Sequence, residues 1–103
     1  MKDLANLQKM LKTAKEMQEK LQKELAEMRV SGTSGGGMVN VTMDGHKNVT
    51  SVHIDPEVVN RDEVEMLQDL ILAALADAMA KAEEHIAQKL GDLGGGLKIP
   101  GLF

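Results

Sequence analysis

The sequence predicts an α+β fold in which two long helices flank a small sheet of three antiparallel strands. Two observations lead to this prediction. Apolar residues recur at helical spacing over about residues 3–28 and again over about 60–90, whereas residues of the stretch 29–54 alternate between apolar and polar side chains. A chain of 103 residues forms one domain at most, so we expect a single domain over residues 1–103.

The first predicted helix carries an apolar stripe whose members are separated by alternating steps of three and four residues, as in the seam of a coiled coil. Gln18 interrupts this seam with a polar side chain. Gln18 is either a surface residue at the edge of the seam or a polar contact that sets the register between paired helices. The seam contains Leu4, Leu7, Leu11, Ala14, Leu21, Leu25 and Met28.

The middle of the chain predicts a β-hairpin. Residues 39–44 alternate between apolar and polar side chains, as a half-buried strand does. Asp44 and Gly45 then predict a type I′ turn, which needs positive φ at both central residues. The returning strand is expected over about residues 49–54, with its apolar side chains at 52 and 54 on one face.

A third, shorter strand is expected over residues 29–33, before the hairpin. The glycines at 35–37 separate it from the hairpin, and we interpret them as a flexible connector that leaves the sheet room to pair across a dimer. They do not form a phosphate-binding P-loop, because no Gly-Lys-Ser/Thr follows at the required spacing.

The second predicted helix covers about residues 60–90. Asn60 and Glu63 form a plausible capping pair at its start. Gly91 is expected to be its C-cap. The tail, residues 91–103, is too rich in glycine and proline for regular structure.

The lengths of these elements predict a homodimer. A helix of about 27 residues is roughly 40 Å long, whereas a strand of five or six residues spans roughly 18 Å. Both helices must therefore extend past the sheet, and their apolar stripes need cover that one chain supplies only in part. We expect joined sheets at the centre of the dimer and paired helices that project as arms. The packing residues would be Leu4, Leu7, Leu11, Leu21, Leu25, Val39 and Val41.

Charge is distributed unevenly along the chain. The formal net charge is −4, yet residues 1–30 hold seven of the twelve basic residues, and residues 55–92 hold ten acidic residues against three basic ones. The lysines of the first helix lie outside its seam, and several have a glutamate four residues later, such as Glu16 after Lys12. This face is either a solvated, salt-bridged surface or a site for an anionic partner. Its lysines are Lys2, Lys9, Lys12, Lys15, Lys20 and Lys23.

A further expectation concerns how the two helices pair. If they lie antiparallel, the first half of helix one would meet the end of helix two. Lysines from both helices would then gather near the tip of an arm. They would be Lys2, Lys9, Lys12, Lys15, Lys81 and Lys89.

No constellation in the sequence favours catalysis or metal binding. The chain has no cysteine, and its three histidines, at 46, 53 and 85, do not have the spacing of metal ligands on one helix. We therefore expect neither an enzyme nor a metal, cofactor or small-molecule substrate. No apolar run has the length of a membrane span, and no signal peptide is evident, so we expect a soluble cytoplasmic protein.

Three segments together resemble one known family. They are Gly-Gly-Gly-Met-Val-Asn-Val-Thr-Met-Asp-Gly at 35–45, Val-His-Ile-Asp-Pro at 52–56 and Gly-Gly-Leu-Lys-Ile-Pro-Gly at 95–101. With the lysine- and methionine-rich first helix, the chain resembles the YbaB/EbfC family of bacterial nucleoid-associated proteins over essentially its whole length. The resemblance implies an intertwined homodimer with tweezer-like helical arms that binds duplex DNA at the nucleoid.

Our first hypothesis is therefore a DNA-binding homodimer that affects nucleoid organisation or gene expression. Its contacts would be mainly to phosphates, with weak sequence dependence, because Arg29 and Arg61 are the only arginines and no Trp or Tyr is available to stack on bases. The alternative is a structural or adaptor dimer whose arms clamp a protein partner. A membrane-surface arm is disfavoured, because the first helix has no aromatic anchor.

Overall fold

The structure is a computed structural model that describes residues 2–94, and the side chains of residues 3–92. It has the predicted α+β fold, with two long helices and one three-stranded antiparallel sheet. Short 3₁₀ turns cover Gly35–Gly37, Pro56–Val58 and Arg61–Glu63. The helices and strands are α1 (Lys2–Glu27), β1 (Val30–Ser34), β2 (Val39–Met43), β3 (Val49–Ile54) and α2 (Val64–Gly94).

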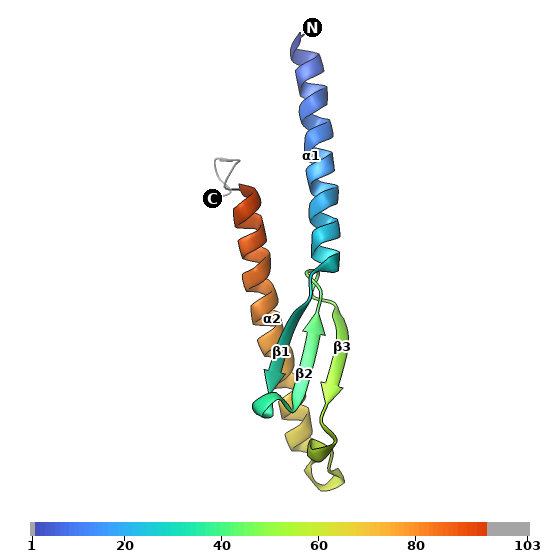
Figure 1. Ribbon diagram of the computed structural model, residues 1–103, viewed down its shortest axis with the longest axis vertical. Helices are drawn as coiled ribbons and strands as arrows, with labels where there is room; N and C mark the ends of the chain where they lie inside the picture. The colour runs from blue at the N-terminus through green and yellow to red at the C-terminus, as the bar shows by residue number, and fades with distance from the viewer. Residues whose placement is uncertain (1, 95–103) are drawn as a thin grey trace.

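The molecule is elongated, with extents of 74 × 22 × 16 Å. Figure 1 shows why: α1 projects from one end of the sheet, whereas α2 starts beyond the other end and runs back along the sheet toward α1. The two helices are therefore antiparallel, and α2 ends beside the C-terminal half of α1. The first half of α1 extends beyond every other described element.

The sheet has the order β1-β2-β3, and α2 covers the face formed by β1 and β2. The alternation predicted for β2 is confirmed, because Val39, Val41 and Met43 are all buried beneath α2. Strand β3 continues the same face, since Val52 is the register partner of Val41. However, α2 does not reach that far, and Val49 and Val52 remain 46% and 50% exposed.

Strand β1 lies unusually close to α2. Three alanines spaced by four residues, Ala74, Ala78 and Ala82, form a fully buried stripe on the helix. Gly32 of β1 faces this stripe, and a Cβ atom at Gly32 would lie 2.1 Å from the backbone nitrogen of Ala78. The backbone of β1 therefore packs directly against the backbone of α2. This close approach is possible because Gly32 has no side chain and the facing residues of α2 are alanines.

The link between β1 and β2 is a defined left-handed turn. Gly35, Gly36 and Gly37 have φ values of 61°, 68° and 94°. Residues with a Cβ rarely adopt these values, which explains why three glycines occur in succession. The segment connects β1 to β2 as expected, but it does so through a turn with these defined φ values and not as a flexible link.

The turn predicted between β2 and β3 is wrong in type. Positive φ is found at Lys47 (65°), not at Asp44 or Gly45, so the connection is a longer loop than a type I′ turn. Asp44 organises this loop: its Oδ1 accepts hydrogen bonds from the backbone N–H groups of His46 (2.8 Å) and Asn48 (3.0 Å). The aspartate thus acts through its side chain, as Asp commonly does in turns.

The two predicted ends of the second helix have different outcomes. At the start, Asn60 caps the 3₁₀ turn that leads into α2, because its Oδ1 accepts a hydrogen bond from the N–H of Asp62 (3.0 Å). Glu63, the other member of the predicted pair, contacts Asn60 through its backbone N–H (2.9 Å to the Asn60 backbone oxygen) and not through its side chain. At the other end, the prediction that Gly91 terminates the helix is wrong, since α2 continues to Gly94. An internal glycine costs only about 1 kcal/mol, which a long helix tolerates. The rest of the predicted tail, residues 95–103, lies outside the described residues.

Asp77 of α2 fixes the outer edge of β1. Its Oδ2 accepts a hydrogen bond from the N–H of Thr33 (2.9 Å) and one from Lys81 Nζ (3.0 Å). The Thr33 hydrogen bond, followed by the contact with Lys81, holds the pKa of Asp77 below its ordinary value. A depressed folded-state pKa stabilises the fold above the unfolded pKa of about 4 and loses that contribution as pH falls further.

We therefore expect Asp77→Asn to lower the melting temperature at pH 7. The difference from the parent protein should shrink as the pH is lowered from about 5 to about 3, because the parent loses the same charged contact by protonation. Thermal unfolding of both proteins, followed by circular dichroism across this range, measures the difference. A difference that stays constant with pH would contradict the role of the ionised carboxylate.

Candidate nucleic-acid interface

The apolar seam of α1 divides into two halves. Near the sheet, Leu21 and Leu25 are half-buried. Toward the N-terminus, the side chains of Leu4, Leu7 and Leu11 are 61%, 51% and 63% exposed. Within the described chain, the first half of the seam thus lacks cover. By contrast, Val39 and Val41, which we also expected to pack in a dimer, are fully buried in the chain's own core.

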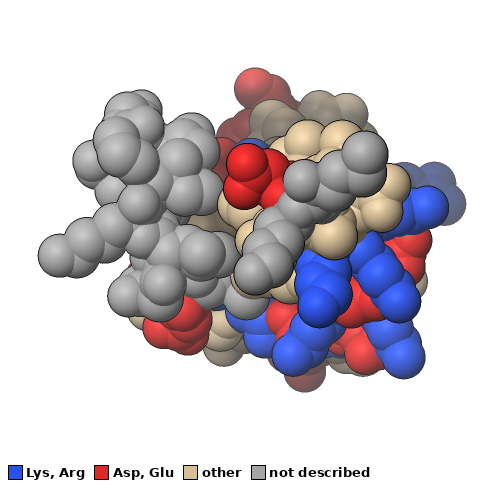
Figure 2. Space-filling view, turned by 90° about the horizontal axis from the view of Figure 1, so that it is seen from above, with Lys and Arg blue, Asp and Glu red and all other residues tan. Residues whose placement is uncertain are grey.

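The opposite face of α1 carries the basic side chains. Figure 2 looks down the long axis of the molecule and shows lysine and arginine side chains gathered on one side, with acidic side chains among them. The side chain of Lys2 lies outside the described set. The other predicted lysines, all of them exposed, are Lys9, Lys12, Lys15, Lys20 and Lys23.

These five lysines form no ion pair with the acidic side chains that the structure describes. The pairs expected along this face, such as Lys12 with Glu16, are therefore not formed within 4.0 Å. An exposed ion pair gains little electrostatic energy in water and costs the conformational entropy of two long side chains, so it contributes little to stability. The ammonium groups consequently remain available to an anionic partner. We call the exposed set Lys9, Lys12, Lys15, Lys20 and Lys23 the lysine face.

The expected cluster of lysines from both helices is not formed. Lys89 lies opposite the C-terminal half of α1, where its Nζ is 3.3 Å from Glu24 Oε2. Lys81 is farther away, beside the sheet, paired with Asp77. The prediction is wrong because α2 uses much of its length to cover the sheet and ends before it reaches the first half of α1 (Figure 1).

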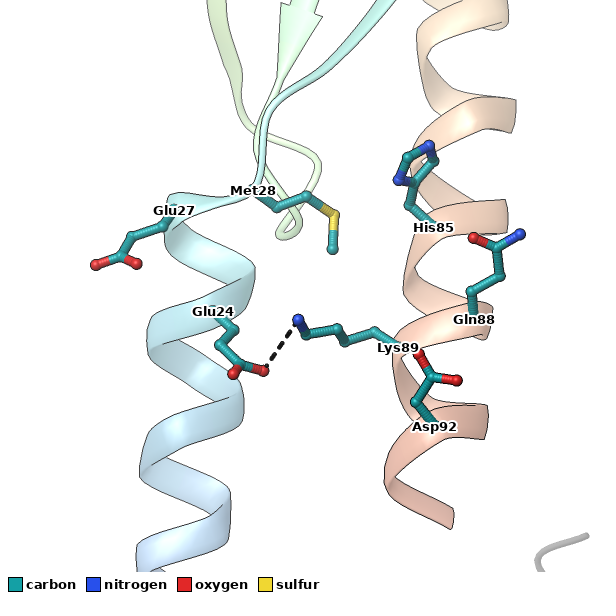
Figure 3. A pocket seen from close by; sticks show the side chains of 7 residues that line it. All are labelled: Glu24, Glu27, Met28, His85, Gln88, Lys89 and Asp92. Carbon is teal, nitrogen blue, oxygen red and sulfur yellow. Dashed lines mark ion pairs between the residues drawn. The ribbon is translucent and has the colours of Figure 1, made fainter. Parts of the chain in front are cut away.

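An open pocket of about 410 Å³ lies between the two helices near the end of α1. In Figure 3, Lys89 reaches across from α2 to Glu24, Met28 points toward α2, and Glu27 points away from it. His85 and the other lining residues do not form a set of metal ligands, and no such set occurs among the residues described. The pocket thus lies between charged side chains of the two helices. Its lining consists of Glu24, Glu27, Met28, His85, Gln88, Lys89 and Asp92.

The C-terminus of α1 is capped by groups that the sequence did not point out. Arg29 donates from its Nη1 to the backbone oxygens of Ala26 and Met28, both at 2.8 Å. The N–H of Gly45, in the β2–β3 loop, donates to the backbone oxygen of Leu25 at 2.7 Å. These contacts satisfy carbonyls that a helix end leaves free, and the positive guanidinium suits the negative end of the helix dipole. A basic residue just after the helix was the available signal for Arg29, whereas the contact of Gly45 depends on tertiary structure.

None of the described helices is both long and apolar enough to cross a membrane. The chain matches the model of the YbaB/EbfC DNA-binding family over residues 1–97. It is 50% identical over 101 residues to the nucleoid-associated protein TTE0040 of Caldanaerobacter subterraneus, covering 95% of this chain and 91% of that one. It is 48% identical over 104 residues to a nucleoid-associated protein of Dictyoglomus thermophilum, covering the full length of both.

The fold is also found in a solved structure. The crystal structure of the uncharacterized protein HP0035 from Helicobacter pylori aligns with a TM-score of 0.73 at 24% identity, covering 86% of this chain and 94% of that one. At this identity the likeness establishes the fold alone. The family match and these two curated relatives span nearly the whole chain. The chain belongs to the YbaB/EbfC DNA-binding family.

Proposed function

We propose that this protein is a nucleoid-associated protein that binds duplex DNA as a homodimer, with the lysine face of α1 on the phosphate backbone. The observation that carries this proposal is the lysine face itself: five exposed ammonium groups without ion-pair partners among the described residues, on a helix that projects from the body. The DNA-binding family and the nucleoid-associated relatives support it.

The side chains present favour phosphate contacts over base recognition. Arginine is the residue best suited to read guanine edges, but Arg29 is occupied in capping α1, and Arg61 lies in a 3₁₀ turn at the opposite end of the molecule. Lysines contact phosphate as point charges and carry no sequence information. We therefore infer weakly sequence-dependent binding that depends strongly on salt.

The exposed apolar residues support assembly with a second copy. Leu4, Leu7 and Leu11 present a seam with helical spacing, which fits another helix, and Val49 and Val52 leave an apolar area on β3. Large apolar side chains in contiguous exposed rows mark interaction surfaces. A second chain supplies helices of the same period, so it is the partner that we propose. Light scattering should then give the mass of two chains.

The test is a fluorescence-anisotropy titration with duplex DNA at several salt concentrations. We expect the logarithm of the affinity to fall linearly with the logarithm of the salt concentration, with a slope of about −0.9 for each phosphate contact. Duplexes of unrelated sequence should give similar affinities. Failure to bind any duplex at about 50 mM salt, where counterion release favours binding, would contradict the proposal and favour a protein partner for the arms.

A further inference from the structure

The loop between β2 and β3, residues 44–48, touches both helices. Gly45 contacts α1 through the hydrogen bond to Leu25, and Lys47 contacts α2 through an ion pair with Glu83 (3.0 Å). The loop therefore occupies the point where the sheet and the two helices meet. We call residues 44–48 the junction loop.

The contact between Gly45 and α1 leaves no free space. A Cβ atom at Gly45 would lie 2.7 Å from the backbone oxygen of Leu25, 2.8 Å from its Cα and 2.9 Å from its Cδ2. Two of these atoms belong to the helix backbone, so a side-chain rotation cannot relieve the contact. Gly45 itself is buried. The base of α1 thus lies directly against the junction loop.

The junction loop is held in one conformation by its own contacts. Asp44 accepts the backbone N–H groups of His46 and Asn48, and its backbone N–H donates to the backbone oxygen of Asn48 (3.0 Å). The backbone hydrogen bond from Asn48, followed by those from the His46 backbone and the Asn48 side chain, lowers the pKa of Asp44 below its ordinary value. The base of α1 therefore packs against a loop whose conformation is fixed by its own hydrogen bonds.

Few other contacts orient α1. Only Met28 and Arg29 connect it to β1, and Glu24 with Lys89 forms the ion pair across the pocket. That ion pair is partly exposed, and such pairs contribute little to stability. Lys9 lies 16 residues from Leu25, roughly 24 Å along the helix, so a tilt of about 10° at the base moves Lys9 by roughly 4 Å. This displacement exceeds the 3.4 Å axial spacing of phosphates along one DNA strand.

We propose that the junction loop, with Gly45 as its positioning residue, sets the direction of α1 and thereby aligns the lysine face with the DNA backbone. The proposal rests on the proposed function for its effect on DNA. Its structural part, the direction of α1, is independent of DNA.

The experiment compares Gly45→Ala with Gly91→Ala. Both changes add one methyl group to a glycine, but Gly91 has no neighbouring atom within 4 Å of the added Cβ. Because the chain has no cysteine, spin labels can be attached to cysteines introduced at the exposed positions Thr13 and Ala80, one on each helix. Labelled chains diluted into an excess of unlabelled chain report the distance between α1 and α2 within one chain by pulsed electron paramagnetic resonance.

We expect Gly45→Ala to shift or broaden the distance distribution and to weaken duplex binding by roughly fivefold or more, the effect of losing one phosphate contact at about 0.15 M salt. Gly91→Ala should change neither quantity. Circular dichroism and light scattering should show that both variants keep the helical content and the mass of the parent.

Asp44→Ala provides a second test that does not add bulk. It removes a negative charge, so a purely electrostatic effect would strengthen DNA binding, whereas loss of the loop conformation should weaken it and broaden the distances. Glu84→Ala is the matched control, because Glu84 is exposed and forms no ion pair among the described residues. It should strengthen binding slightly and leave the distances unchanged.

Unchanged distances in both Gly45→Ala and Asp44→Ala would overturn the proposal, and so would altered distances with undiminished DNA binding. If the parent protein does not bind duplex DNA at low salt, the proposed function fails. In that case the distance measurements alone decide whether the junction loop directs α1.

Discussion

Replacing Gly32 with alanine is expected to destabilise the protein by about 3 kcal/mol or more, a large share of the stability of a small domain. The added Cβ would lie 2.1 Å from the backbone nitrogen and 2.6 Å from the Cα of Ala78, and 2.5 Å from the backbone oxygen of Ala74. All three atoms belong to the backbone of α2, so the strand and the helix would have to separate. Separation would also uncover Val39 and Val41, the centre of the core.

Two other glycines provide graded controls for this prediction. Gly36 has open space around its Cβ position but a φ of 68°, so Gly36→Ala should cost about 1–2 kcal/mol from backbone strain alone. Gly91 has open space within α2, and Gly91→Ala should stabilise the helix by up to about 1 kcal/mol. Urea or thermal unfolding measures the series. A Gly32→Ala protein that unfolds no more easily than Gly36→Ala would contradict the close contact with α2.

The second large effect is expected for DNA binding. Substituting Lys9, Lys12 and Lys15 together with alanine should weaken duplex binding about a hundredfold at about 0.15 M salt for each arm of the dimer that contacts the duplex, since each lost phosphate contact contributes roughly fivefold. The loss should be similar for unrelated sequences, and the salt slope should fall by about 0.9 for each contact removed. Alanine is the best helix former, so α1 should remain helical. Anisotropy titrations of parent and variant at several salt concentrations make the comparison.

Acidic residues on the same face supply the converse test. Glu16 and Glu19 lie among these lysines along α1, and their replacement by glutamine should strengthen binding. Lys81→Ala removes one positive charge at a distance from the lysine face and should have little effect. If Lys81→Ala weakened binding as much as the triple substitution, DNA contact would have to be assigned to another surface.

Much of the fold followed from local pattern. Helical spacing located both long helices, and the alternation of Val39, Val41 and Met43 located the central strand and its buried face. Local pattern was insufficient where tertiary contacts decide. In the sequence, Gly32 is only a residue with low strand propensity. The structure shows why glycine is needed there: a Cβ atom would lie 2.1 Å from the backbone of α2. In the sequence, Gly45 is expected to be a turn residue with positive φ, but the positive φ lies at Lys47. Glycine is needed at position 45 because a side chain there would collide with Leu25.

The sequence was sufficient to predict which lysines of α1 are exposed, but not how the two helices are placed relative to each other. The separation of lysines from the seam follows from helical periodicity, and the structure places five of the six lysines at the surface. The offset between the helices could not be read from sequence, because it depends on where α2 begins relative to the sheet. Consequently Lys81 and Lys89, expected near the tip, are paired with Asp77 and Glu24 instead.

The unsupported first half of α1 also bears on how the chain responds to a partner. Between its start and about residue 17, the helix is held by its own backbone hydrogen bonds, and helices of this length are marginal in water without packing. We therefore expect its amides to open locally at low free energy and to exchange hydrogen faster than those of the sheet. Any surface that covers the seam or the lysine face slows this opening. A partner of α1 therefore contributes order to the helix as well as binding it, and part of the binding free energy is used to suppress fraying.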